Sequence, residues 1–245
     1  MAMSMRRLRG WLGHLRHPRR TAFRLERARE VFSGRAELAY AQHGEDGVLA
    51  GLFEGEPPGF YVDVGAHHPT RLSNTANLYR AGWHGLDVDA RPGTARLFQQ
   101  YRPRDKALEV GVGGKAGTLP FFIFADDALN TFSADWAKMQ AETNGRKIVR
   151  VVDVPVMTLA ELLNAYVPAS QRIDLMSVDV EGLDLEVLQS NDWERFRPRV
   201  VVAEDFGIST LDRIGESHIV QFLGSKGYVP VAKTTVSVFF RSTQT

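Results

Sequence analysis

The stretch from Phe60 to Gly65 constrains the fold of this chain more than any other feature. It is a run of β-branched and aromatic residues that contains one acid, Asp63, and stops at a glycine. A buried parallel strand ends in this way when the loop after it must lie close to a ligand. Because Gly65 has no Cβ, the backbone there can approach a cofactor, and Asp63 can orient the amide groups of the turn.

Similar apolar runs recur along the chain and predict the rest of a sheet. Further parallel strands are predicted at 83–89, 106–112, 173–182 and 199–205, with additional strands at 117–124 and 149–157. The runs at 228–231 and 236–240 predict an antiparallel hairpin at the edge of the sheet. Strands alternating with helical patterns indicate an α/β fold with a doubly wound, mostly parallel, Rossmann-like sheet.

Asp89 closes the second predicted strand, about 20 residues or slightly more beyond the glycine turn. An acid at this place can accept hydrogen bonds from ribose hydroxyls. Asp87 has the same side-chain direction on an extended strand, and Asp89 is preferred because it lies at the strand's end. The turn is not a dinucleotide fingerprint, because His67 and His68 stand where further glycines would be required.

The composition limits the class of protein. A chain of 245 residues with 44% hydrophobic content is long enough for one large α/β domain with an N-terminal appendage. The absence of cysteine excludes disulfides, thiolate catalysis and cysteine-based zinc sites. No run of 18 or more apolar residues and no secretory signal is found, so a cytoplasmic location is expected.

Residues 1–35 form a basic extension to a domain at 36–245. Ten arginines against two glutamates give the extension a charge of +8, and since the whole chain carries +1, the rest sums to −7. Apolar residues at helical spacing, from Leu8 to Leu15, predict a short basic amphipathic helix. Peripheral contact with the inner membrane face is one interpretation, and docking on its own domain or on a second subunit of a homo-oligomer is the other. The acidic body argues against nucleic-acid binding.

A series of short motifs lies between residues 40 and 205. They are Gln42-x-Gly44-Glu45-Asp46, Val62-Asp-Val-Gly-Ala66, Ser73-Asn-Thr75, Leu78-Tyr79, Gly82-Trp83-x-Gly85, Arg102-Pro103-x-Asp105, Thr131-Phe-Ser133, Val178-Asp-Val-Glu-Gly182 and Arg197-Pro198. In their order and separation these motifs resemble the FkbM family of methyltransferases, and the first strand and its loop resemble motif I of class I S-adenosylmethionine-dependent methyltransferases.

The resemblance implies a class I methyltransferase fold, S-adenosylmethionine as cofactor, and methyl transfer to a hydroxyl of a sugar-containing or polyketide-type acceptor, such as a glycan or glycolipid precursor. The candidate cofactor-binding residues are Asp63, Gly65, Ala66, Asn74, Asp89, Asp105 and Asp179. The methyl group must be held in line with the acceptor oxygen, largely by positioning. An alcohol is a poor nucleophile, so it must lose its proton to a base or have its pKa lowered by a metal ion.

The candidate catalytic residues follow from this requirement. They are Asp179, Glu181, His67 and His68. Many family members carry a histidine after the Glu-Gly of strand four, and Leu183 at that place removes one base. Histidine can accept a proton near neutral pH, so His67 and His68 are candidates for the base in this chain.

A divalent ion, Mg²⁺, is the alternative to a base. Asp179, Glu204 and Asp205 are similar to the ligand set of metal-dependent O-methyltransferases of this fold, which take an acid after strand four and an adjacent pair after strand five. Glu204 and Asp205 can share an ion only if the strand ends between them, because successive strand residues point in opposite directions.

Two other functions remain open on the sequence alone. A nicotinamide-dependent oxidoreductase shares the ribose-binding acid but needs the glycines that this turn lacks. A non-catalytic recruitment module would use the basic extension alone.

Overall fold

The computed structural model describes residues 26, 29, 33, 38–208 and 210–244. The chain divides into two units, residues 1–39 and residues 40–245. The predicted amphipathic helix and the predicted boundary after residue 35 lie outside the described residues. No helix in the described part of the chain is both long and apolar enough to cross a membrane.

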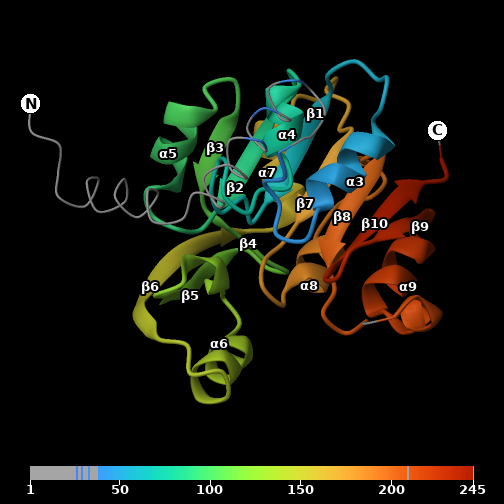
Figure 1. The fold of residues 1–245 in the computed structure, drawn as a ribbon. Helices are drawn as coiled ribbons and strands as arrows, with labels where there is room; N and C mark the ends of the chain where they lie inside the picture. Colours follow the sequence, from blue (N-terminus) through green and yellow to red (C-terminus); the bar gives the residue numbers. More distant parts are fainter. Residues whose placement is uncertain (1–25, 27–28, 30–32, 34–37, 209, 245) are drawn as a thin grey trace, which may run out of the picture. The chain divides into compact units, whose positions relative to one another are not determined.

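The main sheet of residues 40–245 has seven strands in the order β3-β2-β1-β7-β8-β10-β9 (Figure 1). Their bounds are β1 Phe60–Val64, β2 His84–Asp89, β3 Lys106–Glu109, β7 Leu175–Val178, β8 Val200–Glu204, β9 Tyr228–Lys233 and β10 Ser237–Ser242. The first five in spatial order pair in parallel, and β10 is antiparallel to both β8 and β9. This arrangement confirms the predicted doubly wound, mostly parallel sheet with an antiparallel pair at one edge.

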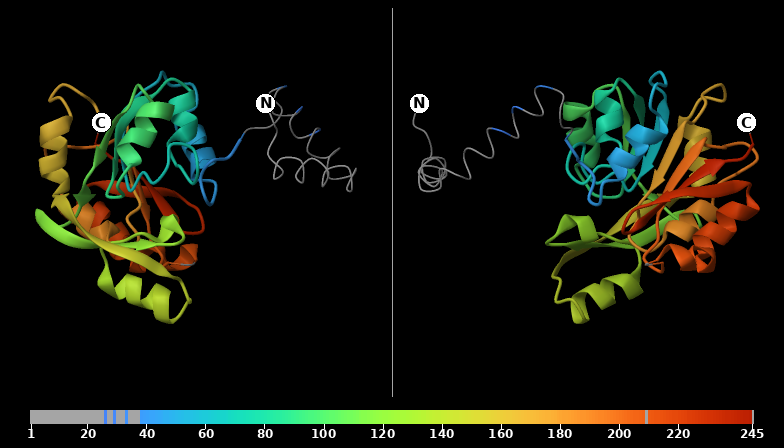
Figure 2. Two further views of the ribbon diagram at one scale, coloured as in Figure 1. Left: turned by 90° about the vertical axis from the view of Figure 1, so that its left-hand side faces the viewer. Right: turned by 45° about the vertical axis from the view of Figure 1, so that its right-hand side comes forward.

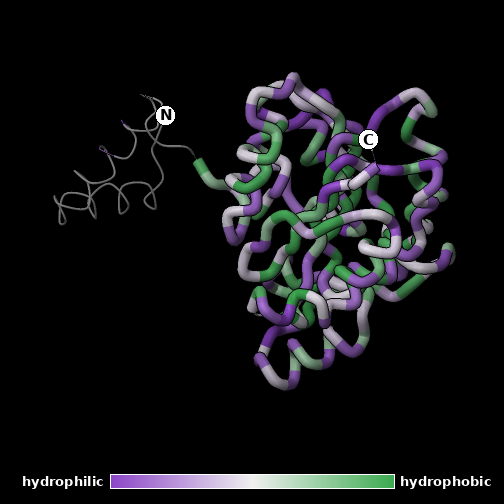
Figure 3. Tube along the Cα trace, turned by 90° about the vertical axis from the view of Figure 1, so that its right-hand side faces the viewer, coloured by the Kyte–Doolittle hydropathy of each residue, from purple (hydrophilic) through white to green (hydrophobic). Residues whose placement is uncertain are grey.

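Helices cover both faces of this sheet because its strands are apolar on both sides. Val62 and Val64 of β1 pack in a core cluster with Leu163 and other residues of three helices, α7 (Leu159–Tyr166), α8 (Asp184–Gln189) and α9 (His218–Ser225). Tyr61, whose side chain points the opposite way, packs in a second cluster with α3 (Glu45–Leu52) and α4 (Ala76–Arg80). Helix α5 (Thr94–Tyr101) contacts β2 and β3. Figure 3 shows apolar segments running through the interior, with polar segments at the turns.

A second sheet forms a lobe at one end of the first. It has the order β4-β6-β5, from β4 Gly111–Val112, β5 Gly117–Phe124 and β6 Ile148–Met157, and β5 is antiparallel to β6. The lobe also carries the short 3-10 helix η1 (Asp127–Leu129) and helix α6 (Ala134–Glu142), and Figure 2 shows it projecting from the sheet. A further 3-10 helix, η2 (Leu211–Glu216), precedes α9.

The predicted single strand at 106–112 is wrong. The chain leaves the main sheet after Glu109, and Gly111 pairs with Val156 of the lobe. Phe132 packs so closely on this crossing that a Cβ at Gly111 would lie 2.4 Å from the Phe132 ring. The glycine therefore marks the junction of the two sheets.

Candidate active site

A pocket lies at the carboxyl ends of β1, β2 and β7. We call it the strand-end pocket. Strands β1 and β7 lie where the strand order reverses, which is the place where open α/β sheets bind ligands. Its lining combines strand ends with the lobe, and includes Gly65, His67, Asp89, Asp127, Asn130, Asp179 and Glu181.

Gly65 is needed for packing between neighbouring strands. Its φ is +83°, and a Cβ built on it would lie 1.7 Å from the carbonyl oxygen of Asp179. The Asp179 amide in turn donates to the carbonyl of Val64 at 2.9 Å. The structure therefore gives this glycine a reason that the sequence did not, because its missing Cβ lets the end of β7 approach the end of β1.

Asp89 lies in the strand-end pocket and organises the loops around it. One carboxylate oxygen accepts the amide of His67 at 2.8 Å, and the other accepts the amide of Arg91 at 2.7 Å. The adjacent Ala66 amide donates to the carbonyl of Val88 at 3.1 Å. Burial raises the pKa of Asp89, and the two backbone donors oppose this rise. Each oxygen retains acceptor capacity for a ligand hydroxyl.

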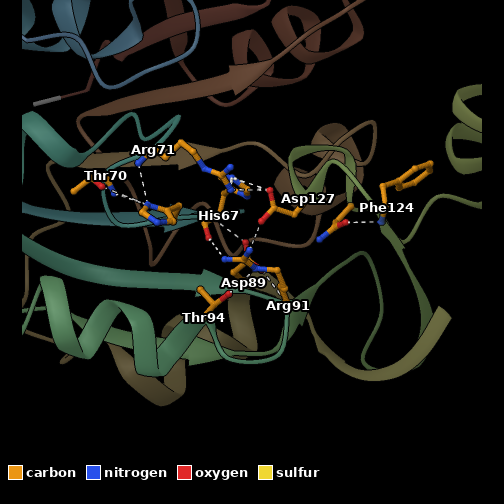
Figure 4. A network of polar contacts seen from close by, with 10 residues as sticks. His67, Thr70, Arg71, Asp89, Arg91, Thr94, Phe124 and Asp127 are labelled. Atoms are coloured by element: carbon orange, nitrogen blue, oxygen red, sulfur yellow. Dashed lines mark hydrogen bonds and ion pairs between the residues drawn. The ribbon is translucent and has the colours of Figure 1, made fainter. Parts of the chain in front are cut away.

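Asp127 of η1 connects the lobe to the loops after β1 and β2 (Figure 4). It accepts a hydrogen bond from Arg71 at 2.7 Å and another from Arg91, whose guanidinium also donates to the carbonyl of His67 at 2.8 Å. Burial opposes ionisation of Asp127, but the positive groups of His67, Arg71 and Arg91 outweigh it and lower the pKa. Asp127 therefore remains an anion that ties the lobe across the pocket.

The two candidate catalytic histidines, His67 and His68, both contact Arg71 through a ring nitrogen. Nδ1 of His68 accepts the amides of Thr70 at 3.1 Å and Arg71 at 3.0 Å, so its lone pair serves the turn. Nε2 of His67 lies 3.2 Å from the Arg71 guanidinium, and burial, with the nearby arginines, lowers the pKa of His67 to about 4. Neither lone pair is free to accept a substrate proton in this arrangement.

Four predicted cofactor residues, Asp63, Ala66, Asn74 and Asp105, do not line the strand-end pocket. Asp63 is buried and accepts the Thr75 hydroxyl at 2.6 Å, and Asn74 donates to Ser177 at 3.2 Å. Asp105 accepts the Tyr61 hydroxyl at 2.5 Å and the Gly85 amide at 2.8 Å, at the start of β3 and thus at the far end of the strands. Their contacts are with the protein interior.

Asp179, Glu181 and Glu204, which we call the carboxylate trio, converge at the ends of β7 and β8. Each offers an oxygen within 4.8 Å of the others, and one oxygen of Glu204 is buried with no hydrogen-bond partner. Burial raises the pKa of Asp179 to about 7, with the charges of Asp63 and Glu45 adding to the rise and the hydrogen bond with Glu204 opposing it. Burial and repulsion from Asp179 raise the pKa of Glu181 to about 9 and that of Glu204 to about 11. Glu181 reaches this place through a left-handed backbone, with φ of +54°, which is unusual for a residue with a side chain.

Asp205 does not join this trio, so the predicted ligand set needs a correction. Strand β8 ends at Glu204, and the Asp205 side chain instead accepts the Ser217 hydroxyl and the Gly207 amide at the start of the next segment. Successive strand residues point in opposite directions, and the Asp205 amide still continues the pairing with the neighbouring segment by donating to the carbonyl of Val236 at 2.7 Å. Glu181 takes the place predicted for Asp205.

The sequence indicates residues 125–148 as a cover over the active site, and the lobe there supplies residues that are not among the named candidates. Asn130 lines the strand-end pocket with a buried side-chain nitrogen that lacks a partner, while its oxygen accepts the Phe124 amide at 2.9 Å. Thr131 donates to the carbonyl of Glu181 at 3.0 Å and so steadies the strained loop. Thr131 belongs to a quoted motif, but nothing in the local pattern around Asp127 or Asn130 indicates which way the lobe folds.

Comparison with known proteins agrees with this geometry. The Methyltransferase FkbM domain matches residues 63–230. Methyltransferase sdnD of Sordaria araneosa is 34% identical over 117 residues, and this match covers 39% of the chain and 45% of sdnD, so the chain spans less than half of that relative.

Solved structures give more distant matches. A TehB-like SAM-dependent methyltransferase from Corynebacterium glutamicum is 12% identical with a TM-score of 0.40, over 92% of this chain and 99% of that one. The 1,6-didemethyltoxoflavin-N1-methyltransferase of Burkholderia thailandensis, solved with S-adenosylhomocysteine, is 11% identical with a TM-score of 0.43, over 93% and 90%. The match of the FkbM domain to more than half of the residues shows that this chain belongs to the FkbM methyltransferase family.

Proposed function

We propose that this protein is an S-adenosylmethionine-dependent O-methyltransferase that acts on a hydroxyl of a sugar-containing or polyketide-type acceptor. One observation carries the proposal: in a chain of this family, the ribose-type acid Asp89 lines a pocket at the switch point of the sheet together with Asp179 and Glu181 of the carboxylate trio. The cofactor would bind in this pocket, and the acceptor hydroxyl would meet its methyl group at the trio.

The residues of the strand-end pocket fit this cofactor. Asp89 can accept ribose hydroxyls with its remaining lone pairs. The unpartnered nitrogen of Asn130 provides a donor, and Val112, Phe121 and Phe132 provide apolar walls for a flat base. A buried donor without a partner costs about 1–3 kcal/mol, which a ligand acceptor would recover.

When bound, S-adenosylmethionine supplies a methyl group on a positively charged sulfur. The protein's part is to hold the acceptor oxygen in line and to weaken its O–H bond. The carboxylate trio is the group placed to do so, since Asp179 and Glu181 line the strand-end pocket and Glu204 lies within reach of both.

We further propose that the trio binds Mg²⁺. Its oxygens are close enough to share an ion, carboxylates are the ligands that Mg²⁺ prefers, and the buried oxygen of Glu204 lacks any other partner. A bound divalent ion lowers the pKa of a coordinated hydroxyl. Titration calorimetry of metal-free protein with Mg²⁺ should detect one site that Glu204→Gln abolishes. Full activity of metal-free protein in EDTA would exclude the ion.

A thermal-shift comparison tests the cofactor assignment. S-adenosylhomocysteine should raise the melting temperature, and NAD should leave it unchanged, because the turn lacks the dinucleotide glycines. Stabilisation by NAD alone would instead favour the oxidoreductase. Transfer of a labelled methyl group to any acceptor would exclude a purely recruiting role.

A further inference from the structure

A second pocket lies on the other side of the carboxylate trio. It is lined by residues from the end of β8, the start of α8, the lobe and the segment that leads into α9. Those that matter here are Trp136, Asp184, Glu204, Asp205, Phe206 and Glu216. Glu204 lines this pocket, whereas Asp179 and Glu181 line the strand-end pocket, so the trio stands between the two.

Phe206 gives this second pocket an exposed aromatic platform. Its ring stacks on the indole of Trp136, with centroids 5.0 Å apart and planes inclined by 22°, yet 47% of Phe206 remains exposed. The indole therefore braces one face of the phenyl ring and leaves much of the residue open to solvent. Single exposed apolar residues are common, but one braced by a second ring inside a pocket is a feature of ligand sites.

The carboxyl groups of the lining disfavour anionic ligands. Asp184, Glu204, Asp205 and Glu216 contribute carboxyl groups, and neither lysine nor arginine lines the pocket among the described residues. The described neighbour Arg213 is paired with Glu216 at 2.6 Å. Carboxylates repel an anionic ligand, whereas hydroxyl groups can both donate to and accept from carboxyl groups, and the side chains of Ser217 and His218 in the lining add further hydrogen-bonding groups.

We infer that this second pocket, the acceptor pocket, binds a neutral pyranose ring with one face on Phe206 and its reactive hydroxyl toward Glu204. The inference rests on the proposed function, whose acceptor class it narrows. The electron-rich face of a phenyl ring attracts the C–H bonds of one sugar face, while the carboxyl groups around it bind the equatorial hydroxyls. Trp136 acts as a positioning residue, because it touches Phe206 rather than the sugar.

Saturation-transfer NMR with defined probes tests this assignment. The probes are the methyl pyranosides of glucose, mannose and galactose, each beside its uronic acid, offered to the full-length protein saturated with S-adenosylhomocysteine. At least one neutral pyranoside should receive saturation, strongest on the protons of one ring face. The matching uronate should bind at least tenfold more weakly.

Three variants test whether Phe206 contributes to binding of the sugar or only to folding of the protein. Phe206→Ala should weaken pyranoside binding at least tenfold, and Phe206→Trp should restore it. Tyr101→Ala removes an aromatic residue that is 53% exposed on α5 and should change nothing. Affinity for S-adenosylhomocysteine should be the same in all four proteins, which also shows that they are folded.

Several results would overturn the inference. These are equal binding of uronates, undiminished binding by Phe206→Ala, tighter binding of a cationic hexosaminide than of its neutral analogue, or no saturation of any neutral pyranoside by protein that binds S-adenosylhomocysteine. In the last case the methyltransferase assignment stands. Conversely, Phe206-dependent pyranoside binding by protein that ignores S-adenosylhomocysteine would remove the proposed function and keep the acceptor pocket.

Discussion

A Cβ atom at position 65 would lie 1.7 Å from the carbonyl oxygen of Asp179. The two residues follow neighbouring parallel strands, and Asp179 also begins the loop that carries two members of the carboxylate trio, Asp179 and Glu181. The spacing of the two strand ends, and with it the width of the strand-end pocket, therefore depends on a glycine at position 65.

Gly65→Ala should destabilise the protein by more than about 2 kcal/mol. A left-handed backbone costs alanine roughly 1–2 kcal/mol, and the overlap with Asp179 forces the strand ends apart in addition. Urea unfolding measures the change. Gly51→Ala is the matched control, because this helical glycine has open space around its Cβ position and alanine should be neutral or stabilising there. Equal stability of the two variants would contradict the packing role.

Asp89→Asn should weaken binding of S-adenosylhomocysteine by about 1.5–3 kcal/mol, the contribution of a charge-assisted hydrogen bond. Asparagine keeps the size of the side chain but turns one acceptor into a donor, facing the backbone amide of His67 or Arg91. Calorimetry measures the affinity, and Asp153→Asn on the exposed side of β6 is the control. Unchanged affinity would show that another acid binds the ribose.

The sheet could be predicted from the sequence because its signals are local. Each buried strand is an apolar run with an acid or glycine at its end, and parallel strands place those ends at one edge. Asp89 and Asp179 were found at the strand-end pocket for this reason. The acids that were assigned less well are those whose position depends on what the chain does after a strand.

Glu181 and Asp205 illustrate that limit. Both follow a strand within a few residues. A left-handed backbone brings Glu181 into the trio, whereas a hydrogen bond from the Ser217 hydroxyl holds the Asp205 side chain outside it. The lobe posed the same difficulty, because Asp127 and Asn130 reach the pocket through contacts with residues distant in sequence. Such contacts follow from tertiary packing and leave no periodic pattern.

The pH dependence of stability should contain a contribution from His67. Its pKa is lowered from 6.5 in the unfolded chain to about 4 in the folded protein, chiefly by burial. The unfolded state therefore binds more protons between these values, so the free energy of unfolding should fall as the pH is lowered from 6.5 to 4, by up to about 3 kcal/mol from this group. Urea unfolding of the wild type and His67→Gln at pH 7 and pH 4.5 measures the difference between their slopes.

NMR titration of the imidazole gives an independent readout of the same group. Asp127 favours the protonated ring, so Asp127→Asn should lower the pKa of His67 further. A His67 that titrates near 6.5, or one whose pKa rises in Asp127→Asn, would contradict the arrangement around the lobe.

Residues 1–35 are proposed to govern location or assembly rather than chemistry. Removing residues 1–16 should leave affinity for S-adenosylhomocysteine unchanged, because every residue assigned to the two pockets lies beyond position 40. The truncation should reduce binding to vesicles that contain anionic lipid, or change the oligomer seen by light scattering, since it removes the predicted basic amphipathic helix. A folded truncation that has lost cofactor binding would refute this separation.

Arg102 neutralises a set of buried acids beneath the strand-end pocket. Only 1% of its side chain is exposed, and its guanidinium donates to Ser73 at 2.7 Å and Thr75 at 2.8 Å and lies 3.5 Å from Asp87. Burial raises the pKa of Asp63, Asp87 and Asp105, and the charge of Arg102 opposes this rise in each case. The Arg-Pro-x-Asp motif at 102–105 therefore has a structural role.

Arg102→Met should destabilise the protein by about 3–5 kcal/mol, because it leaves buried carboxyl groups without their cation. The loss should be larger at pH 8 than at pH 5. Without Arg102 the pKa values of the folded acids rise further above their unfolded values, so the folded state binds the extra protons and loses stability as the pH increases. Urea unfolding at both pH values tests this, with Arg96→Met on the exposed face of α5 as a control that should change stability by no more than about 0.5 kcal/mol. A loss that is the same at both pH values would show that Arg102 acts through packing alone.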